Sequence, residues 1–400
     1  MTDVLVVGAG PAGLAAAQVL VAAGLAVTVA ERQPQAGGMP LTCGHSPYGW
    51  REFRRMMGGP AYAARLIDAA RGADLRLATS VAAIHGDGSA TLTSNAGTEI
   101  LTPRKILLAT GAREATRAER LLPGERPLGV MTTGSLQDMW FRHGALPFRR
   151  PVILGSELVA MSAILTCRQA GAAPLALLEQ KDTLTAAAPY RWLPNLLGLP
   201  VHRGVEITDL VAKDGRLDAI RFRSGGKDHK IFCDGLILTG AFRPEAGLAR
   251  MAGLAIDRAT MGPSVDGNGR TSREGIYAAG NILRGVETAG WCWTEGRAIA
   301  QAMLADQAAP GHSKAQSVAP QIALLAGQGL RWIMPQAWHR GAALTLQLNA
   351  DRPHRGQLVA RDSTGSVVYT QKLTTAPERR VTLSPQLGSA TGPVTLSLEP

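Results

Sequence analysis

Three glycines near the amino terminus have the spacing of a dinucleotide-binding turn. Gly8, Gly10 and Gly13 follow one apolar run, and Glu31 ends the next. The first glycine permits a tight turn, the second lets the backbone approach a pyrophosphate, and the third lets a helix lie close to a sheet. The amide groups at the start of that helix face the pyrophosphate, and Glu31 is placed to accept hydrogen bonds from an adenosine ribose.

The hydrophobic pattern predicts the elements that position these residues. Val4 to Val7 and Leu25 to Ala30 are expected to be strands, with a helix of small residues between them. The motif therefore comes with both of its strands, its helix and its acidic residue. This context favours a nucleotide site over a chance glycine turn.

The same segment has a competing interpretation as a membrane span or a signal peptide. Residues 11–30 are almost wholly apolar and about long enough to cross a bilayer. A spanning helix would have to run through Gly13 and Gly24 and end directly on Glu31, and Asp3 stands where a signal peptide has basic residues. We expect no transmembrane segment, a chain that begins here, and a cytoplasmic location.

Composition and charge narrow the class of protein. With 400 residues, 46 glycines and only 4% aromatic residues, the chain fits an α/β protein of two or three domains. Its net charge is +11, but no Lys/Arg block with interleaved aromatics indicates nucleic-acid binding. We interpret the charge as a positive field for anionic ligands or an acidic partner.

The cysteines exclude two kinds of site. Cys43, Cys167, Cys233 and Cys292 are far apart in the sequence, so neither a CxxC redox pair nor a zinc knuckle is available. We predict reduced thiols and no metal site.

A second unit repeats the first. Pro151 opens a predicted strand over Val152 to Leu154, which precedes a helix from Ser156 to about Ala170 and a strand that ends at Glu179. Where the first unit has three glycines, however, this one has Gly155, Glu157 and Ala160. A carboxylate at the position of closest approach clashes with a pyrophosphate in volume and in charge, although Glu179 still offers a ribose acceptor. NAD(P) binding by this unit is therefore doubtful.

Between the units, a loop and a strand lie where a flavin dinucleotide would pass. A turn-rich loop begins at Gly37 and Gly38 and contains Cys43 and His45, and Arg51 to Ala70 is predicted to be one helix. Lys105 to Leu108 is a predicted strand, and it ends in a small-residue turn, Ala109-Thr110-Gly111.

A third motif makes the interpretation specific. The segment from Thr271 to Asn281 predicts a strand that ends in Gly280-Asn281, with a helix from about Thr294. It resembles the second FAD motif of two-dinucleotide-domain flavoproteins, the glutathione-reductase-like or pyridine nucleotide-disulfide oxidoreductase superfamily. That family usually has Gly-Asp here, and its acid holds the flavin ribityl chain. Asn281 keeps the reach and loses the charge, and its amide can still hydrogen-bond a ribityl hydroxyl.

The resemblance covers about residues 1–310 and implies a fold and a cofactor. The fold is α/β, with two Rossmann-like domains, the second inserted in the first. The cofactor is FAD, and the motifs assign its contacts to Gly8, Gly10, Pro11, Ala12, Gly13, Glu31, Arg32, Gly38, Met39, Val81, Ala109, Thr110, Gly111, Gly280 and Asn281.

The superfamily's redox cysteine pairs are missing, which argues against a disulfide reductase. The chain looks most similar to the flavoprotein A or alpha subunits of opine, amino-acid and hydrogen-cyanide-producing dehydrogenases. Members of that group work with a second flavoprotein and often with an iron–sulfur unit. The chain lacks the clustered cysteines of an iron–sulfur site, so any cluster belongs to a partner.

Two loop residues are candidate catalytic groups. Cys43 and His45 follow the Gly37-Gly38 turn and could place a thiolate or an imidazole near the flavin, although a structural role is the competing interpretation. Trp291, beside Cys292 and Trp293, is a candidate wall of the flavin pocket, with ordinary packing as the alternative.

From about Ala315 the pattern changes to short alternating strands between Gly, Asp, Asn and Pro turns. We predict a small antiparallel β module that docks or caps, and we expect FAD to stay bound without it. The predicted domains are an FAD-binding domain (1–115 and 245–312), an NAD(P)-binding-like domain with a degenerate glycine motif (116–244), and the C-terminal β module (313–400).

Three functional hypotheses follow. The first is an FAD-dependent dehydrogenase subunit that passes electrons from a small amine, amino acid or hydroxy acid to a partner subunit. The second is a self-sufficient NAD(P)H-dependent flavin reductase, which the intact Glu179 keeps open. The third is a non-catalytic flavin-binding assembly or sensor protein.

Overall fold

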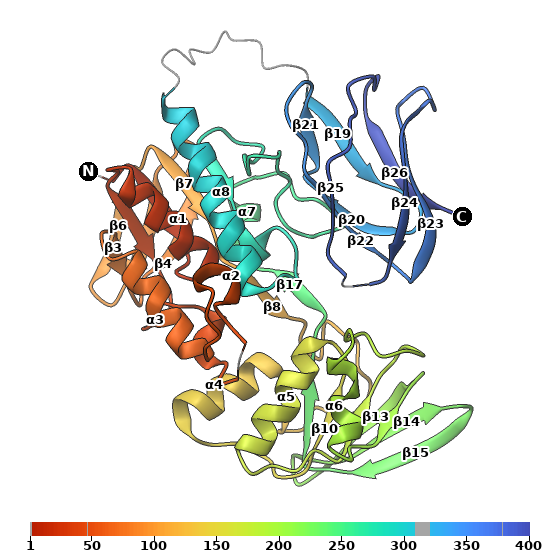
Figure 1. The fold of residues 1–400 in the computed structure, drawn as a ribbon. Coiled ribbons are helices and arrows are strands. Elements are labelled where there is room, and N and C mark those ends of the chain that lie inside the picture. Colours follow the sequence, from red (N-terminus) through yellow and green to blue (C-terminus); the bar gives the residue numbers. More distant parts are fainter. Residues whose placement is uncertain (1, 46, 309–320, 378) are drawn as a thin grey trace.

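The computed structural model describes residues 2–45, 47–308, 321–377 and 379–400. Figure 1 shows three bodies: two at the top, built from the N-terminal region and from the C-terminal strands, and a third below them, built from the middle of the chain. Two short antiparallel strands, β8 (Ala112–Glu114) and β17 (Phe242–Pro244), connect the upper and lower bodies. We propose that the inserted domain begins and ends next to these strands.

The N-terminal body is built on a parallel five-stranded sheet. Its strands, in spatial order, are β18 (Ile276–Ala278), β7 (Lys105–Leu108), β1 (Val4–Val7), β2 (Val27–Ala30) and β3 (Asp74–Arg76). The central strands are rich in Val, Leu and Ile and almost wholly buried, as a parallel sheet covered on both sides requires.

Helices cover one face of this sheet. They are α1 (Pro11–Ala22), α3 (Gly59–Ala69) and α8 (Ala289–Ala308). Helices α1 and α8 pack very closely, because Gly296 has no side chain: a Cβ there would lie 2.1 Å from the carbonyl oxygen of Ala12. The other face packs against α7 (Gly247–Met251) and an antiparallel sheet of β4 (Ser80–Ile84), β5 (Ala90–Ser94) and β6 (Gly97–Leu101).

Two predicted helices differ from the observed ones. Instead of one helix over residues 51–70, a single turn, α2 (Trp50–Phe53), precedes α3. Arg54 ends α2 in the left-handed region with φ 52°, and the Gly58-Gly59-Pro60 segment starts a new helix. Helix α8 begins at Ala289, before the predicted Thr294, so Trp291, Cys292 and Trp293 lie in its first turns.

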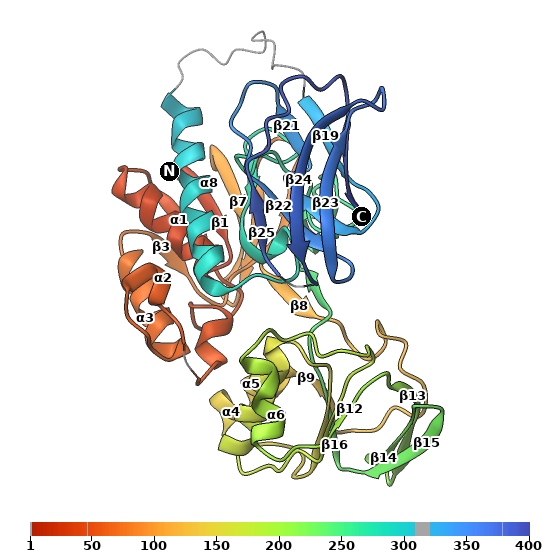
Figure 2. The same cartoon turned by 45° about the vertical axis from the view of Figure 1, so that its right-hand side comes forward.

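The inserted body repeats the same architecture. Its parallel sheet contains β12 (Val201–His202), β11 (Ala176–Leu178), β10 (Pro151–Leu154), β16 (Gly235–Leu238) and β9 (Val130–Thr132). Helices α4 (Thr133–His143) and α5 (Leu158–Gln169) lie on one side, with the short helices η2 (Tyr190–Trp192) and α6 (Leu193–Leu196). An antiparallel sheet of β13 (Glu206–Lys213), β14 (Arg216–Ser224) and β15 (Lys227–Phe232) covers the other side (Figure 2).

The C-terminal body is a β module, as the alternating pattern predicts, and it consists of two sheets. The first contains β21 (Ala337–His339), β19 (Gln321–Ala326), β26 (Val394–Glu399), β23 (His354–Arg361) and β24 (Val367–Thr375), and the second contains β20 (Leu330–Met334), β22 (Leu346–Ala350) and β25 (Val381–Leu383). All pairs are antiparallel except β19 with β26. The predicted start of this module, residues 313–320, lies outside the described residues.

This module shares a core with the N-terminal body. Trp332 and Met334 of β20 are buried in the same cluster as Leu5, Leu108 and Ile282. Removal of the module would expose that cluster to water, at a cost of several kcal/mol for side chains of this size. The packing therefore argues against the expectation that FAD binding survives its deletion.

Candidate functional site

The first glycine turn has the geometry that its spacing predicts. Gly8 lies in the left-handed region with φ 105°, and a Cβ there would meet the Ala109 carbonyl oxygen at 2.5 Å. A Cβ at Gly13 would lie 2.0 Å from the Gly8 carbonyl oxygen. Gly10, the N-cap of α1, is different: nothing lies within 4 Å of its Cβ position. The space in front of α1 is therefore open, and it fits an anionic group at the helix amino terminus.

Glu31 points back toward this turn. Its carboxylate accepts hydrogen bonds from the backbone amides of Ala9 and Gln33, each at 2.9 Å, and its side chain is buried. A carboxylate accepts more than two hydrogen bonds, so Glu31 keeps capacity for ribose hydroxyls. The next residue, Arg32, is exposed.

The remaining predicted contacts of the first unit belong to segments that lie against Gly10 or Glu31. Gly38, at φ 64°, begins the short helix η1 (Met39–Thr42), and a Cβ there would lie 2.9 Å from the Gly10 Cα. Met39 is 56% exposed. Val81 lies on β4, two residues after Thr79, whose amide donates to the Glu31 carbonyl oxygen.

The turn after β7 lies against the carboxyl end of β1. The Ala109 amide donates to the Val7 carbonyl oxygen, and the Thr110 hydroxyl donates to the Glu245 carbonyl oxygen at 2.8 Å. Gly111, at φ 75°, has open space at its Cβ position. Pro11 and Ala12 form the first turn of α1.

The second flavin-like motif packs on the first. Gly280, at φ 80°, starts the short helix η3 (Gly280–Ile282), and a Cβ there would lie 2.8 Å from the Ala12 Cβ. The Asn281 side chain donates to the Glu287 carbonyl oxygen at 3.2 Å, while its own Oδ1 is buried without a partner among the described residues. A buried, unpaired acceptor is costly unless it binds a donor, so Oδ1 fits a ligand hydroxyl.

A buried ionic network supports this motif. Glu295 accepts a hydrogen bond from the Gly280 amide at 2.7 Å and pairs with Arg284 at 2.9 Å. Arg284 is only 1% exposed and lies 3.6 Å from Glu287. Glu287 in turn accepts hydrogen bonds from Gln347 and from Arg380 of the C-terminal module.

The inserted unit reproduces the first in detail. Gly155 has φ 122°, and its amide donates to the Leu178 carbonyl oxygen as Gly8 donates to Ala30. Glu179 is buried and accepts hydrogen bonds from the Ser156 hydroxyl and from the Lys181 amide at 2.9 Å.

Glu157 makes the difference between the units. It is the N-cap of α5, the position of Gly10 in α1. Its carboxylate accepts a hydrogen bond from the Thr239 hydroxyl at 2.8 Å and lies over Gly240, whose Cβ position is 2.4 Å from the Glu157 Cδ. Burial raises the pKa of Glu157, while the hydrogen bond from Thr239 and the charge of Arg120 act in the opposite direction. A carboxylate thus fills the space that is open in the first unit.

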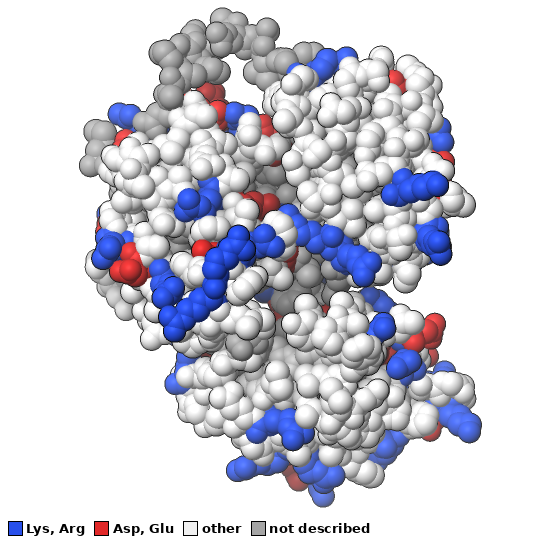
Figure 3. Space-filling model, viewed as in Figure 1, with Lys and Arg blue, Asp and Glu red and all other residues white. Residues whose placement is uncertain are grey.

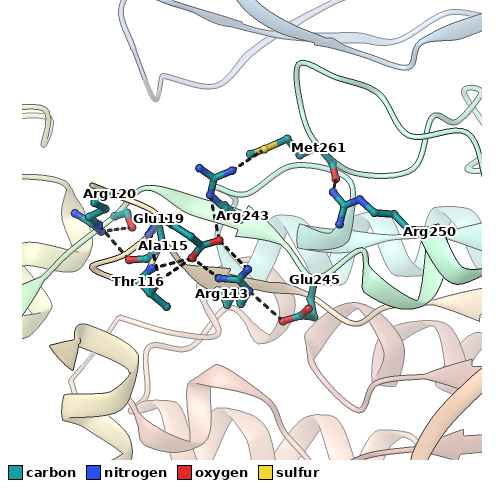
Figure 4. Close-up of polar contacts among 10 residues, drawn as sticks. Arg113, Ala115, Thr116, Glu119, Arg120, Arg243, Glu245, Arg250 and Met261 are labelled. Atoms are coloured by element: carbon teal, nitrogen blue, oxygen red, sulfur yellow. Dashed lines mark hydrogen bonds and ion pairs between the residues drawn. The ribbon is translucent and has the colours of Figure 1, made fainter. Parts of the chain in front are cut away.

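Figure 4 shows polar contacts near the strands β8 and β17, which connect the N-terminal and inserted bodies. Arg120 donates to the carbonyl oxygen of Ala115 at 3.1 Å. It also donates to the carbonyl oxygens of Thr239 and Gly240, at 2.7 and 2.8 Å. Arg113 forms two hydrogen bonds with Glu119, at 2.6 and 2.8 Å. This ion pair lowers the pKa of Glu119 to about 2.

The two candidate catalytic residues are brought together, but at a domain boundary. Cys43 Sγ lies 2.9 Å from His45 Nε2, and the His45 ring also contacts Ser162 Oγ of α5. Gln137 of α4 donates to the same Ser162 oxygen at 2.7 Å. Burial raises the pKa of Cys43, but hydrogen bonds from His45, Tyr48 and Ser162 outweigh it and leave that pKa below its usual value.

Several site residues carried no signal in the sequence. Arg284, Glu287 and Glu295 follow the third motif in the sequence, but nothing in their spacing indicates a buried ion network. Arg120 and Glu114 lie in the segment that leads from the N-terminal body into the inserted body. Glu114 accepts a hydrogen bond from the Gly134 amide, at the start of α4, at 2.6 Å. Only the folded chain brings these groups together.

Two kinds of feature are not found in the described part of the chain. No group of His, Cys, Asp or Glu side chains there could hold a metal ion, and the described cysteines are all free thiols. No described helix combines the length and the apolar character needed to cross a membrane.

Comparison with known proteins agrees with the geometry. An opine oxidase subunit from Rhizobium meliloti is 26% identical over 84% of this chain and 68% of its own length. The corresponding opine oxidase subunit from Agrobacterium tumefaciens is 27% identical over 76% of this chain and 65% of its own length. The chain thus spans about two thirds of the length of these relatives.

A solved structure, the thioredoxin reductase of T. acidophilum, covers 77% of this chain with a TM-score of 0.64 and 21% identity, which shows the shared fold. The sequence profile of the pyridine nucleotide-disulphide oxidoreductase family matches residues 2–303. The chain therefore belongs to the pyridine nucleotide-disulphide oxidoreductase family and is an FAD-dependent oxidoreductase of that type.

Proposed function

We propose that the chain is the FAD-bearing subunit of a dehydrogenase. It would take electrons from a small amine, amino acid or hydroxy acid and pass them to a second flavoprotein, an iron–sulfur protein, or both. The observation that carries this proposal is Glu157: its carboxylate lies over Gly240, where a nicotinamide dinucleotide would place its pyrophosphate. With that position filled, reduced nicotinamide is not the electron source.

FAD in the first unit would supply the two-electron chemistry. Gly10 and the first amides of α1 would receive its pyrophosphate, because this space is open. Glu31 would accept the ribose hydrogen bonds, and Asn281 Oδ1 would accept one from a ribityl hydroxyl. The other predicted contacts, from Gly38 and Met39 to Gly111, would line the same cofactor.

The missing cysteine pairs support the same proposal. Cys167, Cys233 and Cys292 are buried, and burial raises the pKa of each thiol to about 12, so they are protonated and poor nucleophiles. Cys43 is engaged with His45 at the domain boundary. Electrons on the flavin would therefore have to leave the chain, and the relatives named as subunits agree with an external acceptor.

Anaerobic single-turnover mixing tests the proposal. We expect the flavin absorbance of purified holoprotein to bleach with an opine, an amino acid or a hydroxy acid, in the presence of its co-purified subunits. The alternative is a self-sufficient flavin reductase, which the preserved hydrogen bonds of Glu179 favour. Rapid bleaching by NADH or NADPH alone would select that alternative.

A further inference from the structure

Five arginines form a band across the junction between the N-terminal and C-terminal bodies, which we call the basic ridge. Its members are Arg51, Arg54, Arg55, Arg379 and Arg380, from the α2 region and the start of β25. The first four are exposed, and the Arg380 side chain is 25% exposed. Figure 3 shows basic side chains running across this face, from the N-terminal body to the lower edge of the C-terminal sheets.

Most of the arginines on the ridge have no carboxylate partner among the residues that the structure describes. Within the described ranges, Arg51, Arg54, Arg55 and Arg379 form no ion pair, whereas Arg113 and Arg270 elsewhere are paired with carboxylates. Unpaired guanidinium groups in close succession repel one another and attract an anionic surface.

Aromatic and apolar side chains accompany these charges. The guanidinium carbons of Arg51 and Arg380 lie 3.5 and 3.9 Å from the ring centroid of Trp291. Trp50 is 60% exposed and Met56 is 65% exposed. Trp, Met and Arg are the residues enriched in protein interfaces, and Trp and Arg carry most of the binding energy there.

The ridge is also connected to the second flavin-like motif. Arg380 bonds to Glu287, which lies beside Arg284, and Arg284 pairs with Glu295. Glu295 accepts the hydrogen bond of the Gly280 amide. A partner seated on the ridge would therefore dock close to the predicted flavin site, where electron transfer requires it.

We propose that the basic ridge is the docking surface for an acidic redox subunit that receives electrons from the flavin. This inference rests on the proposed function and adds the surface and the charge of the partner. A nucleic acid is the less fitting occupant, because guanidinium groups already cover the Trp291 ring, so that of the two ridge tryptophans only Trp50 is open to base stacking.

The test compares two double charge reversals of equal size. Arg55→Glu/Arg379→Glu changes two exposed ridge side chains that form no ion pair within the described ranges. Lys213→Glu/Lys227→Glu changes two exposed lysines at the ends of β13 and β15 in the inserted domain and serves as the control. Each chain is expressed in the source cells, and its retained subunits are measured by sizing chromatography at increasing salt, with flavin absorbance recorded throughout.

We expect the ridge variant to keep its FAD and to bind its redox subunit about tenfold more weakly or worse, with a smaller salt dependence than wild type. The control should behave as wild type, and the redox partner retained by wild type should reoxidise the reduced flavin. A ridge variant that holds this partner no less tightly than wild type, at every salt concentration, overturns the docking surface but leaves the proposed function intact. A lone wild-type chain with full turnover overturns both.

A second measurement separates the two classes of occupant. Fluorescence anisotropy follows binding of labelled polyglutamate and of labelled single-stranded RNA to purified holoprotein. We expect polyglutamate to bind the wild type and the lysine control but not the ridge variant. Ridge-dependent binding of RNA without binding of polyglutamate would overturn the proposal.

Discussion

The two dinucleotide units share one backbone arrangement but differ in the space that each leaves at the start of its helix. In each, a glycine at positive φ donates its amide to the end of the neighbouring strand, and a buried glutamate, Glu31 or Glu179, accepts a hydrogen bond from the amide two residues further on. The N-cap of the helix differs: Gly10 faces open space, whereas Glu157 fills it. We propose that this one side chain at the amino terminus of a helix decides whether a Rossmann-like unit offers a nucleotide site.

The largest expected effect comes from making the first unit like the second. Gly10→Glu should abolish FAD retention, weakening binding by about 100-fold or more, because its carboxylate occupies the pyrophosphate position. The fold should survive, since nothing lies within 4 Å of that Cβ and the backbone φ of −83° suits any residue. Flavin absorbance and circular dichroism check both statements, and a variant that stays yellow contradicts the assignment.

A smaller effect on FAD affinity should distinguish Glu31 from Glu179. Glu31→Ala should weaken FAD binding by about 1–3 kcal/mol, because ribose hydrogen bonds are lost in a buried setting. Glu179→Ala removes the matching side chain of the second unit and serves as the control, because it too leaves a backbone amide without its acceptor. Equilibrium dialysis of FAD against both variants measures the difference, and equal losses of affinity would place the cofactor elsewhere.

Replacing Glu157 with glycine should open the second unit to a dinucleotide. Wild type should bind NADH poorly, and Glu157→Gly should gain about tenfold in affinity, or about 1.4 kcal/mol, as the carboxylate leaves the space over Gly240. Isothermal titration of holoprotein with NADH measures the gain. Tight binding by wild type would show that Glu157 turns aside, and would reverse the order of the two functional alternatives.

The smallest effect concerns pH. Burial raises the pKa of Glu157, so the folded state favours the protonated form of its carboxyl group. The pKa of this group in the unfolded chain is about 4.3. The fold therefore becomes less stable as pH rises from that value through the pKa of the folded state. Glu157→Gln should remove that loss. The free energy of unfolding of the variant, relative to wild type, should therefore increase as pH rises above about 4.3 in urea titrations. A difference independent of pH would contradict the burial of this charge.

The sequence was most informative where the spacing of neighbouring residues determines the local backbone conformation. The glycine turn, the strand Lys105–Leu108 and the repeated unit could be predicted, because buried Val and Leu runs and positive-φ glycines impose their own local structure. The break between α2 and α3 was missed, since the apolar period continues across Gly58 and Gly59. The start of α8 was placed five residues late, because Trp291 and Cys292 are equally compatible with a loop that walls a pocket.

The polar contacts between bodies had no sequence signal. Arg284 and Glu295 meet only when α8 packs against η3, and Arg380 reaches Glu287 from the C-terminal module. The sequence indicates Cys43 and His45 as candidate catalytic groups, but their partners Ser162 and Gln137 lie far along the chain, on the inserted domain. Such contacts follow from domain packing and not from spacing.

We propose that the first unit holds the flavin while Glu157 closes the second unit to reduced nicotinamide. Anaerobic stopped-flow mixing of purified holoprotein with NADH and with NADPH tests it most directly, with flavin absorbance as the readout and Glu157→Gly measured beside wild type. We predict one FAD per chain and no rapid bleaching of the wild-type flavin by either nucleotide. Rapid bleaching of the wild type would contradict the claim.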